Sequence, residues 1–354
     1  YNTCLAGVDG QETFERSAEG VRIPTSNQTT QPTEDGGQLN LSIDANLQFF
    51  AQQVLADTVN ELSATWASAI VVEVETGRIL AAAEAPTVDP NDPAAVPAAD
   101  RGSRIFQAAF EPGSIMKAVS ASMVLDTGTA DEYDTVPAPD RMNLDFDNEY
   151  IKDSFSHEDF TLSLAGVLRY SSNTGMTNFA SQIPRETRYE YLKKFGFGSV
   201  SPLRFEGESS GILHPASQWD EMTNLVTTFG QGISVTSVQM AYAYQAIANG
   251  GVRLDPILVD SCLAADGSVA YAPNQGSTRV LLTASANLNL ELMEQVVEFG
   301  GVGKTAAIPG YRVAGKTGTA DKPMRGGGYY EDKVITTFAS VFPTEAPKYV
   351  LLVT

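Results

Sequence analysis

Cysteine and histidine are both scarce in this sequence of 354 residues, which contains two of each. Cys4 and Cys262 are far apart, and neither has a second cysteine or a histidine at the spacing of a zinc site. The sequence therefore predicts no metal centre and no other cofactor, and it leaves open whether the cysteines are free or form one disulfide. Neither cysteine has a base nearby in the sequence, so neither is favoured as a nucleophile.

Basic residues and long apolar runs are also few. Lys and Arg total 23 against 43 Asp and Glu, which gives a net charge of -20. This charge repels nucleic acid backbones and anionic membrane surfaces, so no nucleic acid partner is expected. No apolar run reaches about 18 residues, and the N-terminus lacks a charged leader followed by an apolar stretch, so no membrane span or targeting segment is predicted within the chain.

The first 40 residues differ in composition from the rest of the chain. They are polar, and residues 25–37, TSNQTTQPTEDGG, are typical of an extended linker. A folded domain is expected from residue 41 to residue 354.

Within that domain, strands are predicted at both ends and helices between them. Helical spacing of apolar residues, with cap residues at the ends, is found over 42–66, 111–128, 161–170, 174–181, 236–251 and 285–299. Strand-like runs are found over 68–84, 256–273, 311–319, 334–342 and 349–354. The first two of these are expected to be hairpins that turn at Thr76-Gly77 and Asp266-Gly267. The sequence thus predicts an α+β fold with a mainly antiparallel sheet flanked by helices.

Particular residues are expected to cap these helices. Ser42 or Asp44 is the candidate for the first helix, and Thr236 with Gln239 matches a capping box. Ser285 is expected to cap the last helix.

Residues 310–320, GYRVAGKTGTA, match the phosphate-loop pattern G-x-x-x-x-G-K-[ST]. A phosphate loop leads into a helix whose N-terminal amides bind the phosphates. Here Gly318, Pro323 and the glycines at 326–328 follow, which disfavours a helix. The string is therefore interpreted as a strand that places Lys316 and exposed amides along one border of the sheet.

Residues 207–211, GESSG, match the nucleophile elbow G-x-S-x-G around Ser209. That elbow needs a following helix and a later histidine as base. His214 follows too closely and precedes Pro215, so the segment is interpreted as a turn. His157 lies in an acidic stretch and is expected to be a surface residue without a catalytic role.

A serine nucleophile would then need a base other than histidine, and residues 111–117, EPGSIMK, offer one. Ser114 and Lys117 are three residues apart on the first turn of a predicted helix, so their Cβ atoms are expected about 5–6 Å apart. Lysine titrates near 10.4 in water, so a basic role at neutral pH requires a pKa lower by about three units. Burial and a second cation both lower a lysine pKa, and Lys316 is the candidate cation.

Three short motifs occur in order: SIMK at 114, SSN at 171 and KTGT at 316. S-x-x-K alone is a common helix turn, and S-x-N recurs at Ser285. Ser171 is preferred because it joins two predicted helices in the helical part of the chain. Together the three motifs resemble the penicilloyl-serine transferase superfamily.

Within that superfamily the sequence is similar to the monofunctional (class B) penicillin-binding proteins. The similarity extends from about Leu41 to Thr354. It includes VVEVETGRILAAAEAPTVDPN, FEPGSIMK, LRYSSNTGM, FGQGISVTSVQMAYAYQAIANGG, AGKTGTA and GGGYYEDKVITTFASVFP.

The resemblance implies the penicillin-binding transpeptidase fold, with the active site between the sheet and a helical lobe, and a D,D-transpeptidase that cross-links peptidoglycan stem peptides. Ser114 would attack the carbonyl of the penultimate D-Ala, and Lys117 would accept its proton. Ser171 would relay a proton to the leaving D-Ala. Asn173 would bind Lys117 and the substrate amide, and Lys316 would set the electrostatics around Ser171.

The resemblance also implies the binding groups of the site. Thr317 and Thr319 would bind the terminal carboxylate of the stem peptide, and Gly318 between them would also contribute to substrate binding. The backbone N–H groups of Ser114 and Thr319 would form the oxyanion hole. β-Lactam antibiotics would acylate Ser114.

By the same resemblance, residues 1–40 would be the end of an N-terminal pedestal domain with its linker, and 41–354 the transpeptidase domain without its last strand and packing helix. Class members carry an N-terminal membrane anchor, which holds them at the extracytoplasmic face of the cell membrane. The same location is expected for this protein, with the anchor in a segment absent from this chain. The expected protein partners are a membrane glycosyltransferase and divisome or elongasome proteins, bound through segments missing here.

Three alternatives to a transpeptidase share the serine acyl-enzyme chemistry. A class A β-lactamase needs a Glu with an Asn four residues later, and the candidates Glu206 and Glu208 are followed at that spacing by Ser210 and Ile212, which disfavours it. A D,D-carboxypeptidase differs only in its acceptor. A non-catalytic β-lactam-binding sensor would be acylated without useful turnover.

Overall fold

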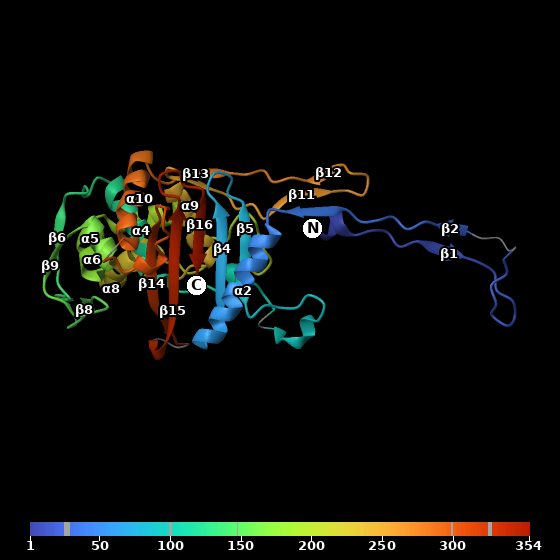
Figure 1. Ribbon diagram of the computed structural model, residues 1–354, viewed down its shortest axis with the longest axis horizontal. Coiled ribbons are helices and arrows are strands. Elements are labelled where there is room, and N and C mark those ends of the chain that lie inside the picture. Colours follow the sequence, from blue (N-terminus) through green and yellow to red (C-terminus); the bar gives the residue numbers. More distant parts are fainter. Residues whose placement is uncertain (25–28, 99–100, 147, 299, 325–327) are drawn as a thin grey trace. The chain divides into compact units, whose positions relative to one another are not determined.

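The computed structural model describes residues 1–24, 29–98, 101–146, 148–298, 300–324 and 328–354 (Figure 1). The chain divides into two compact units. The smaller unit comprises Tyr1–Ser42 and Ile257–Asn274, and the larger comprises Ile43–Pro256 and Gln275–Thr354. The segment 257–274 therefore packs with the N-terminal residues, although it follows most of the larger unit in the sequence.

The smaller unit consists of short strands and one helical turn. Its elements are α1 (Asn2–Leu5), β1 (Gln11–Thr13), β2 (Thr29–Gln31), β3 (Gln38–Leu41), β11 (Val259–Leu263) and β12 (Val269–Tyr271). β11 and β12 form the predicted hairpin around Asp266-Gly267, and β3 pairs with the other edge of β11. Cys4 and Cys262 form a disulfide with their Cα atoms 6.5 Å apart. The sequence alone left open whether these cysteines are free or paired.

The predicted linker over residues 25–37 is partly wrong. Residues 25–28 lie outside the described residues, but β2 pairs with β1, and Glu34 forms a bridge with Val8. All six residues of the β1–β2 ladder are exposed. Their backbone groups bond across the ladder, so a segment that is polar on both faces still forms a strand pair.

The larger unit contains an antiparallel sheet of five strands within the described residues, in the order β14-β15-β16-β4-β5. These strands are β4 (Ala67–Glu73), β5 (Ile79–Ala85), β14 (Ala314–Pro323), β15 (Tyr329–Phe342) and β16 (Tyr349–Val353). β16 pairs with β4, so the last strand of the chain lies beside the first strand of the sheet. The prediction of strands at both ends of the domain that form one antiparallel sheet is confirmed.

Helices pack on the sheet and on one another. The main ones are α2 (Ala45–Leu62), α4 (Met116–Asp126), α5 (Leu164–Tyr170), α6 (Asn173–Ala180), α9 (Ser237–Ala248) and α10 (Thr283–Val297). α9 contacts β4, β15 and β16, α10 contacts β14, and α2 packs on β4 and β5. Every residue of α9 is buried, and its two glutamines, Gln239 and Gln245, donate side-chain hydrogen bonds to the Ser199 and Val74 carbonyls. No helix among the described residues has the length and apolar character needed to cross a bilayer.

Several smaller elements complete the unit. They are α3 (Arg104–Gln107), α7 (Arg185–Lys194), α8 (Glu221–Val226), β6 (Thr135–Ala138), β7 (Arg141–Asn143), β8 (Tyr150–Lys152), β9 (Phe160–Ser163), β10 (Val252–Leu254), β13 (Ser277–Arg279) and the 3-10 turns η1 (Pro93–Ala95), η3 (Gly113–Ile115), η4 (Ala216–Gln218), η5 (Thr227–Phe229) and η6 (Lys304–Ala306).

The predicted starts of two helices, α5 and α10, are wrong. A strand pairing shifts the first, and a carboxylate from another helix accepts a hydrogen bond at the start of the second. Residues 161–163 belong to β9, which pairs with β6, and Ser163 then caps α5 by accepting a hydrogen bond from Gly166 N. Ser285 does not cap α10, since it lies buried inside that helix. The backbone N–H of Leu282, at the start of α10, instead donates to the Asp126 carboxylate at 2.7 Å.

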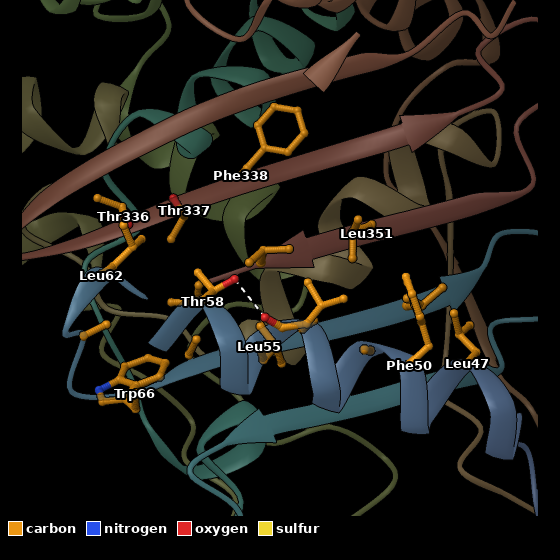
Figure 2. Close-up of a pocket in the computed structure, with 18 of the residues that line it drawn as sticks. Leu47, Phe50, Leu55, Thr58, Leu62, Trp66, Thr336, Thr337, Phe338 and Leu351 are labelled. Atoms are coloured by element: carbon orange, nitrogen blue, oxygen red, sulfur yellow. Dashed lines mark hydrogen bonds between the residues drawn. The ribbon is translucent and has the colours of Figure 1, made fainter. Parts of the chain in front are cut away.

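An apolar cavity of about 780 Å³ lies between α2 and the sheet (Figure 2). The side chains labelled in Figure 2 include Phe50 and Leu62 of α2 and Phe338 and Leu351 of the strands. None of the described residues that line this cavity is Asp, Glu, His, Lys or Arg. The cavity therefore lacks the acid–base groups that acyl transfer needs, and the site lies elsewhere.

Candidate active site

The predicted nucleophile, Ser114, lies on the 3-10 turn η3, which continues directly into α4. The sequence predicted this serine on the first turn of an α-helix. That detail is wrong, because Ser114 lies in the 3-10 turn just before the α-helix. Lys117 follows three residues later in the first turn of α4, and side chains three apart on a continuous helical segment lie on the same face, which brings Ser114 and Lys117 together. Residues 116–124 of α4 are all buried, and Tyr244 donates a hydrogen bond of 2.9 Å to the Ile115 carbonyl, so the turn is held firmly.

Lys117 is completely buried, with its Nζ 2.7 Å from Ser114 Oγ. Nζ also donates to the Ser171 carbonyl at 2.8 Å and to Asn173 Oδ1 at 2.6 Å. Asn173 Nδ2 donates to the Lys152 carbonyl at 2.8 Å, which fixes the orientation of this amide. Carbonyl oxygens only accept, so they engage two hydrogens of the amine. A neutral Lys117 then directs its lone pair toward the Ser114 hydroxyl.

The electrostatic environment makes a neutral lysine accessible. Burial lowers the pKa of Lys117 to about 7, against the opposing negative charge of Asp153. Burial and then the positive charge of Lys117 lower the pKa of Lys316 well below its ordinary value. With a pKa near 7, roughly half of the Lys117 amines are neutral at neutral pH. The residue is thus suited to act as a base.

Ser171 lies between the two lysines. It ends α5 with a left-handed backbone, φ 60°, immediately before α6. Its Oγ lies 3.3 Å from Lys117 Nζ and accepts a hydrogen bond of 2.9 Å from Lys316 Nζ. Lys316, also completely buried, donates a second hydrogen bond to the Thr317 carbonyl at 3.0 Å. The Ser171 hydroxyl can therefore pass a proton along a line of polar groups.

A cleft of about 190 Å³ opens beside these groups. The described residues that line it are Gly113, Ser114, Ser154, Ser171, Asn173, Phe229, Gln231, Val302, Thr317, Gly318 and Thr319. The structure thus brings all the predicted site residues together, either as lining of the cleft or, for Lys117 and Lys316, directly behind it. β14 is the edge strand of the sheet and forms one wall.

Two glycines allow β14 to run against the Ser114 turn. A Cβ at Gly318 would lie 2.3 Å from Thr337 Oγ1 and 3.1 Å from a side-chain carbon of Ile115. Gly113 has φ +53°, and a Cβ there would lie 2.9 Å from the Thr319 carbonyl oxygen. Larger residues would push the strand away from the turn, so the width of the cleft depends on both glycines.

The structure excludes the two competing motif interpretations. β14 continues as a strand to Pro323, so the residues directly after Thr317 form a strand and not the helix that a phosphate loop requires. Ser209 is followed by an irregular segment in which Ile212 bridges to Ser234, and the His214 side chain is exposed. Neither segment has the geometry of the corresponding site.

The prediction that His157 is a surface residue is wrong. Its side chain is only 5% exposed, and Nε2 lies 3.1 Å from Asp153 Oδ2. The ring stacks on Phe160 with centroids 4.3 Å apart and also contacts Phe155, which shields it from solvent.

Sequence reasoning assigned no role to several residues at the site. Ser154, Phe229, Gln231 and Val302 line the cleft, and Asp153 lies behind it. Phe229 and Gln231 belong to the FGQG stretch that carried part of the family resemblance, so the sequence could have indicated that these two residues lie at the site. No motif in the sequence marks Asp153.

The family model described as "Penicillin binding protein transpeptidase domain" matches residues 67–354. The chain belongs to this penicillin-binding protein family. It is 34% identical over 98% of its length to penicillin-binding protein PbpB of Mycolicibacterium smegmatis and covers 54% of that protein. It is 30% identical over 100% of its length to peptidoglycan D,D-transpeptidase FtsI of Escherichia coli K12 and covers 57% of it. The chain therefore spans little more than half the length of these curated relatives.

Solved structures of penicillin-binding proteins share the fold. The apo form of penicillin binding protein 3 from Mycobacterium tuberculosis aligns with a TM-score of 0.86 and 30% identity, over 96% of this chain and 80% of that one. The same protein complexed with aztreonam aligns equally well. A peptidoglycan synthetase from Bifidobacterium adolescentis gives a TM-score of 0.84 at 30% identity, over 99% of this chain and 63% of that one. The predicted fold class is confirmed.

Proposed function

We propose that this chain is the catalytic part of a peptidoglycan D,D-transpeptidase, which works through an acyl-enzyme on Ser114 and is acylated by β-lactams. The observation that carries the proposal is the buried Lys117 amine, 2.7 Å from the Ser114 hydroxyl and with its other hydrogens engaged by carbonyl oxygens. Relatives named D,D-transpeptidase and a similar structure that holds aztreonam support the reaction class.

In the first step, Ser114 Oγ attacks the carbonyl carbon of the penultimate D-Ala while its proton passes to the neutral Lys117 amine. The carbonyl oxygen becomes an oxyanion, which the backbone N–H groups of Ser114 and Thr319 would bind. A donor of this kind is typically worth about 3–4 kcal/mol in the transition state. The terminal carboxylate of the stem peptide would accept hydrogen bonds from Thr317 and Thr319, next to Gly318.

In the second step, the C–N bond to the terminal D-Ala breaks as the tetrahedral intermediate collapses to an ester on Ser114. The leaving nitrogen needs a proton, which Ser171 would supply and regain from Lys117. Lys316 holds the Ser171 hydroxyl in line by its hydrogen bond of 2.9 Å. Asn173 would orient the substrate amide while its own amide remains fixed on Lys152.

In the final step, an amine of a neighbouring stem peptide attacks the ester. The same groups act in reverse, so that Lys117 and Ser171 remove a proton from the amine and return one to Ser114. The new peptide bond forms the cross-link. A D,D-carboxypeptidase would use water at this step, and a β-lactam sensor would stop before it.

Multiple turnover with an added amine tests this function. The purified chain is supplied with a peptide ending in D-Ala-D-Ala, or a thioester donor, together with a D-amino acid acceptor. A transpeptidase releases the leaving group and forms a new amide with the acceptor. Release of the leaving group with hydrolysis alone would indicate a carboxypeptidase. Stoichiometric acylation without turnover would indicate a sensor.

We also propose that the protein acts at the extracytoplasmic face of the cell membrane. The Cys4–Cys262 disulfide supports this location, since disulfides persist in oxidising compartments. A transpeptidase needs uncross-linked glycan strands, so a membrane glycosyltransferase is the partner we expect. Proteins of the divisome or elongasome would bind through segments other than the catalytic unit.

A further inference from the structure

A buried acid, Asp153, contacts the cleft residue Asn173 and is itself contacted by a partly buried histidine, His157, and the proposed mechanism uses neither. Asp153 follows β8, and its side chain is 2% exposed, against 5% for His157 four residues later. Ser154, between them in sequence, lines the cleft itself. Buried ionisable groups are costly unless they are partnered, so the contacts of this pair are informative.

Asp153 holds the N-terminus of α6, the helix that carries Asn173. Its Oδ1 accepts hydrogen bonds from the backbone N–H groups of Asn173 at 2.5 Å and Thr174 at 3.1 Å. A carboxylate is favoured there because the first turn of a helix has unpaired N–H groups and a partial positive charge. Ser172 Oγ accepts from Gly175 N in the same turn. The backbone of Asn173 is therefore fixed by Asp153, and its side chain by Lys117 and Lys152.

His157 in turn holds Asp153. Its Nε2 lies 3.1 Å from Asp153 Oδ2, and its Nδ1 lies 2.6 Å from the Glu158 carbonyl oxygen. Both partners are acceptors, so the protonated imidazolium, which donates from both nitrogens, satisfies them together. Burial opposes this charge, but the Glu158 carbonyl, Asp153 and the nearby Asp140 carboxylate outweigh it and raise the pKa of His157.

We propose that Asp153 and His157 form a positioning pair for the catalytic lysine: His157 orients Asp153, Asp153 anchors the first turn of α6, and α6 presents Asn173 to Lys117. The proposal rests on the function proposed above. Neither residue touches the Ser114 nucleophile. Each acts through another residue, over an unbroken path of hydrogen bonds from the His157 ring to Ser114 Oγ.

The pair also influences the charge of the lysine. The negative charge of Asp153 favours the protonated form of Lys117 and so opposes the lowering of its pKa by burial. Removal of that charge lowers the lysine pKa further. In Asp153→Asn, the acid limb of the acylation profile therefore moves to lower pH, an effect that a purely structural role does not produce.

The test measures acylation of purified, folded variants by a penicillin as a function of pH. His157→Leu removes both nitrogens, and His157→Gln retains a donor for Asp153. His214→Gln changes the other histidine of the chain and serves as the control. We expect the plateau rate to fall roughly ten- to a hundredfold in His157→Leu, because small misplacements of catalytic groups cost about that much. His157→Gln is expected to restore most of the rate, and His214→Gln to match the parent.

A parent that is not acylated would contradict the proposed function itself. A parent that is acylated, with His157→Leu at the same rate and Asp153→Asn with an unshifted acid limb, would overturn only the positioning pair. If the variants do not fold, NMR titration of the parent chain decides the question. The pair requires the His157 imidazole to titrate above the ordinary value of about 6.5. Titration at or below that value would overturn the proposal.

Discussion

Lys316 donates a hydrogen bond of 2.9 Å to the hydroxyl of Ser171, a residue 145 positions earlier in the chain. The bond joins the edge strand β14 to the junction between α5 and α6. The polar line from Lys316 through Ser171 and Lys117 to Ser114 therefore exists only when β14 packs against the helices. Residues from all three short motifs are thus joined by hydrogen bonds in the folded chain, although the motifs are far apart in the sequence.

Removal of the Lys316 amine should take away the shorter of the two lysine hydrogen bonds to the Ser171 hydroxyl, while leaving Ser114 and Lys117 in place. We expect Lys316→Met, which retains most of the buried volume, to lower the rate of acylation by about a hundredfold, the range of a lost general acid–base contribution. Lys304→Met, at an exposed lysine, is the matched control. Stopped-flow acylation by a chromogenic cephalosporin measures both. A rate for Lys316→Met equal to that of the control would remove Lys316 from the mechanism.

Acylation of Ser114 should depend on pH through Lys117. The neutral amine is the active form, so the rate should rise with pH and level off above about 7, the value to which burial lowers the pKa of this lysine. Below that pH the rate should fall about tenfold per unit, as the amine becomes protonated. The second-order acylation rate, measured from pH 5 to pH 10, tests this expectation. A midpoint near the ordinary lysine value would show that Lys117 is not the base.

The approach of β14 to the Ser114 turn should depend on Gly113. A Cβ at this position would lie 2.9 Å from the Thr319 carbonyl oxygen, so Gly113→Ala should displace the strand and slow acylation at least about tenfold. Gly128→Ala is a matched control, because Gly128 also has a positive φ, +66°, but no atom lies within 4 Å of its Cβ position. Both variants carry similar backbone strain. Equal acylation rates in the two would contradict the steric argument.

The Cys4–Cys262 disulfide should stabilise the smaller unit without affecting the chemistry. Removal of a native disulfide typically costs about 2–5 kcal/mol, so the double substitution Cys4→Ser and Cys262→Ser should speed amide hydrogen exchange in residues 1–42. Neither cysteine lines the cleft, so acylation should be unchanged. Hydrogen exchange detected by mass spectrometry, combined with acylation rates, separates the two effects. Unchanged exchange would show that the bond contributes little.

Much of the fold follows from local signals in the sequence. Asp44 caps α2 by accepting hydrogen bonds from two backbone N–H groups, Thr236 and Gln239 form the predicted capping box of α9, and a hairpin turns at Thr76-Gly77. Each of these features depends on residues that are close together in the sequence, and residue type and spacing are sufficient to identify them.

Several features that depend on distant contacts were not predicted. Nothing local indicates that residues 257–274 pack with residues 1–42, or that Phe160–Ser163 pairs as a strand with β6. At the site, the three motifs could be identified because each requires particular residue types at a fixed spacing. Asp153 was missed because it acts on a helix twenty positions later through backbone N–H groups, which any residue supplies.

Mass spectrometry of the chain after reaction with a penicillin identifies the acylated residue. One adduct is expected, on the peptide that contains Ser114, absent in Ser114→Ala and formed much more slowly in Lys117→Ala. An adduct on any other residue, or undiminished labelling of Ser114→Ala, would contradict this expectation.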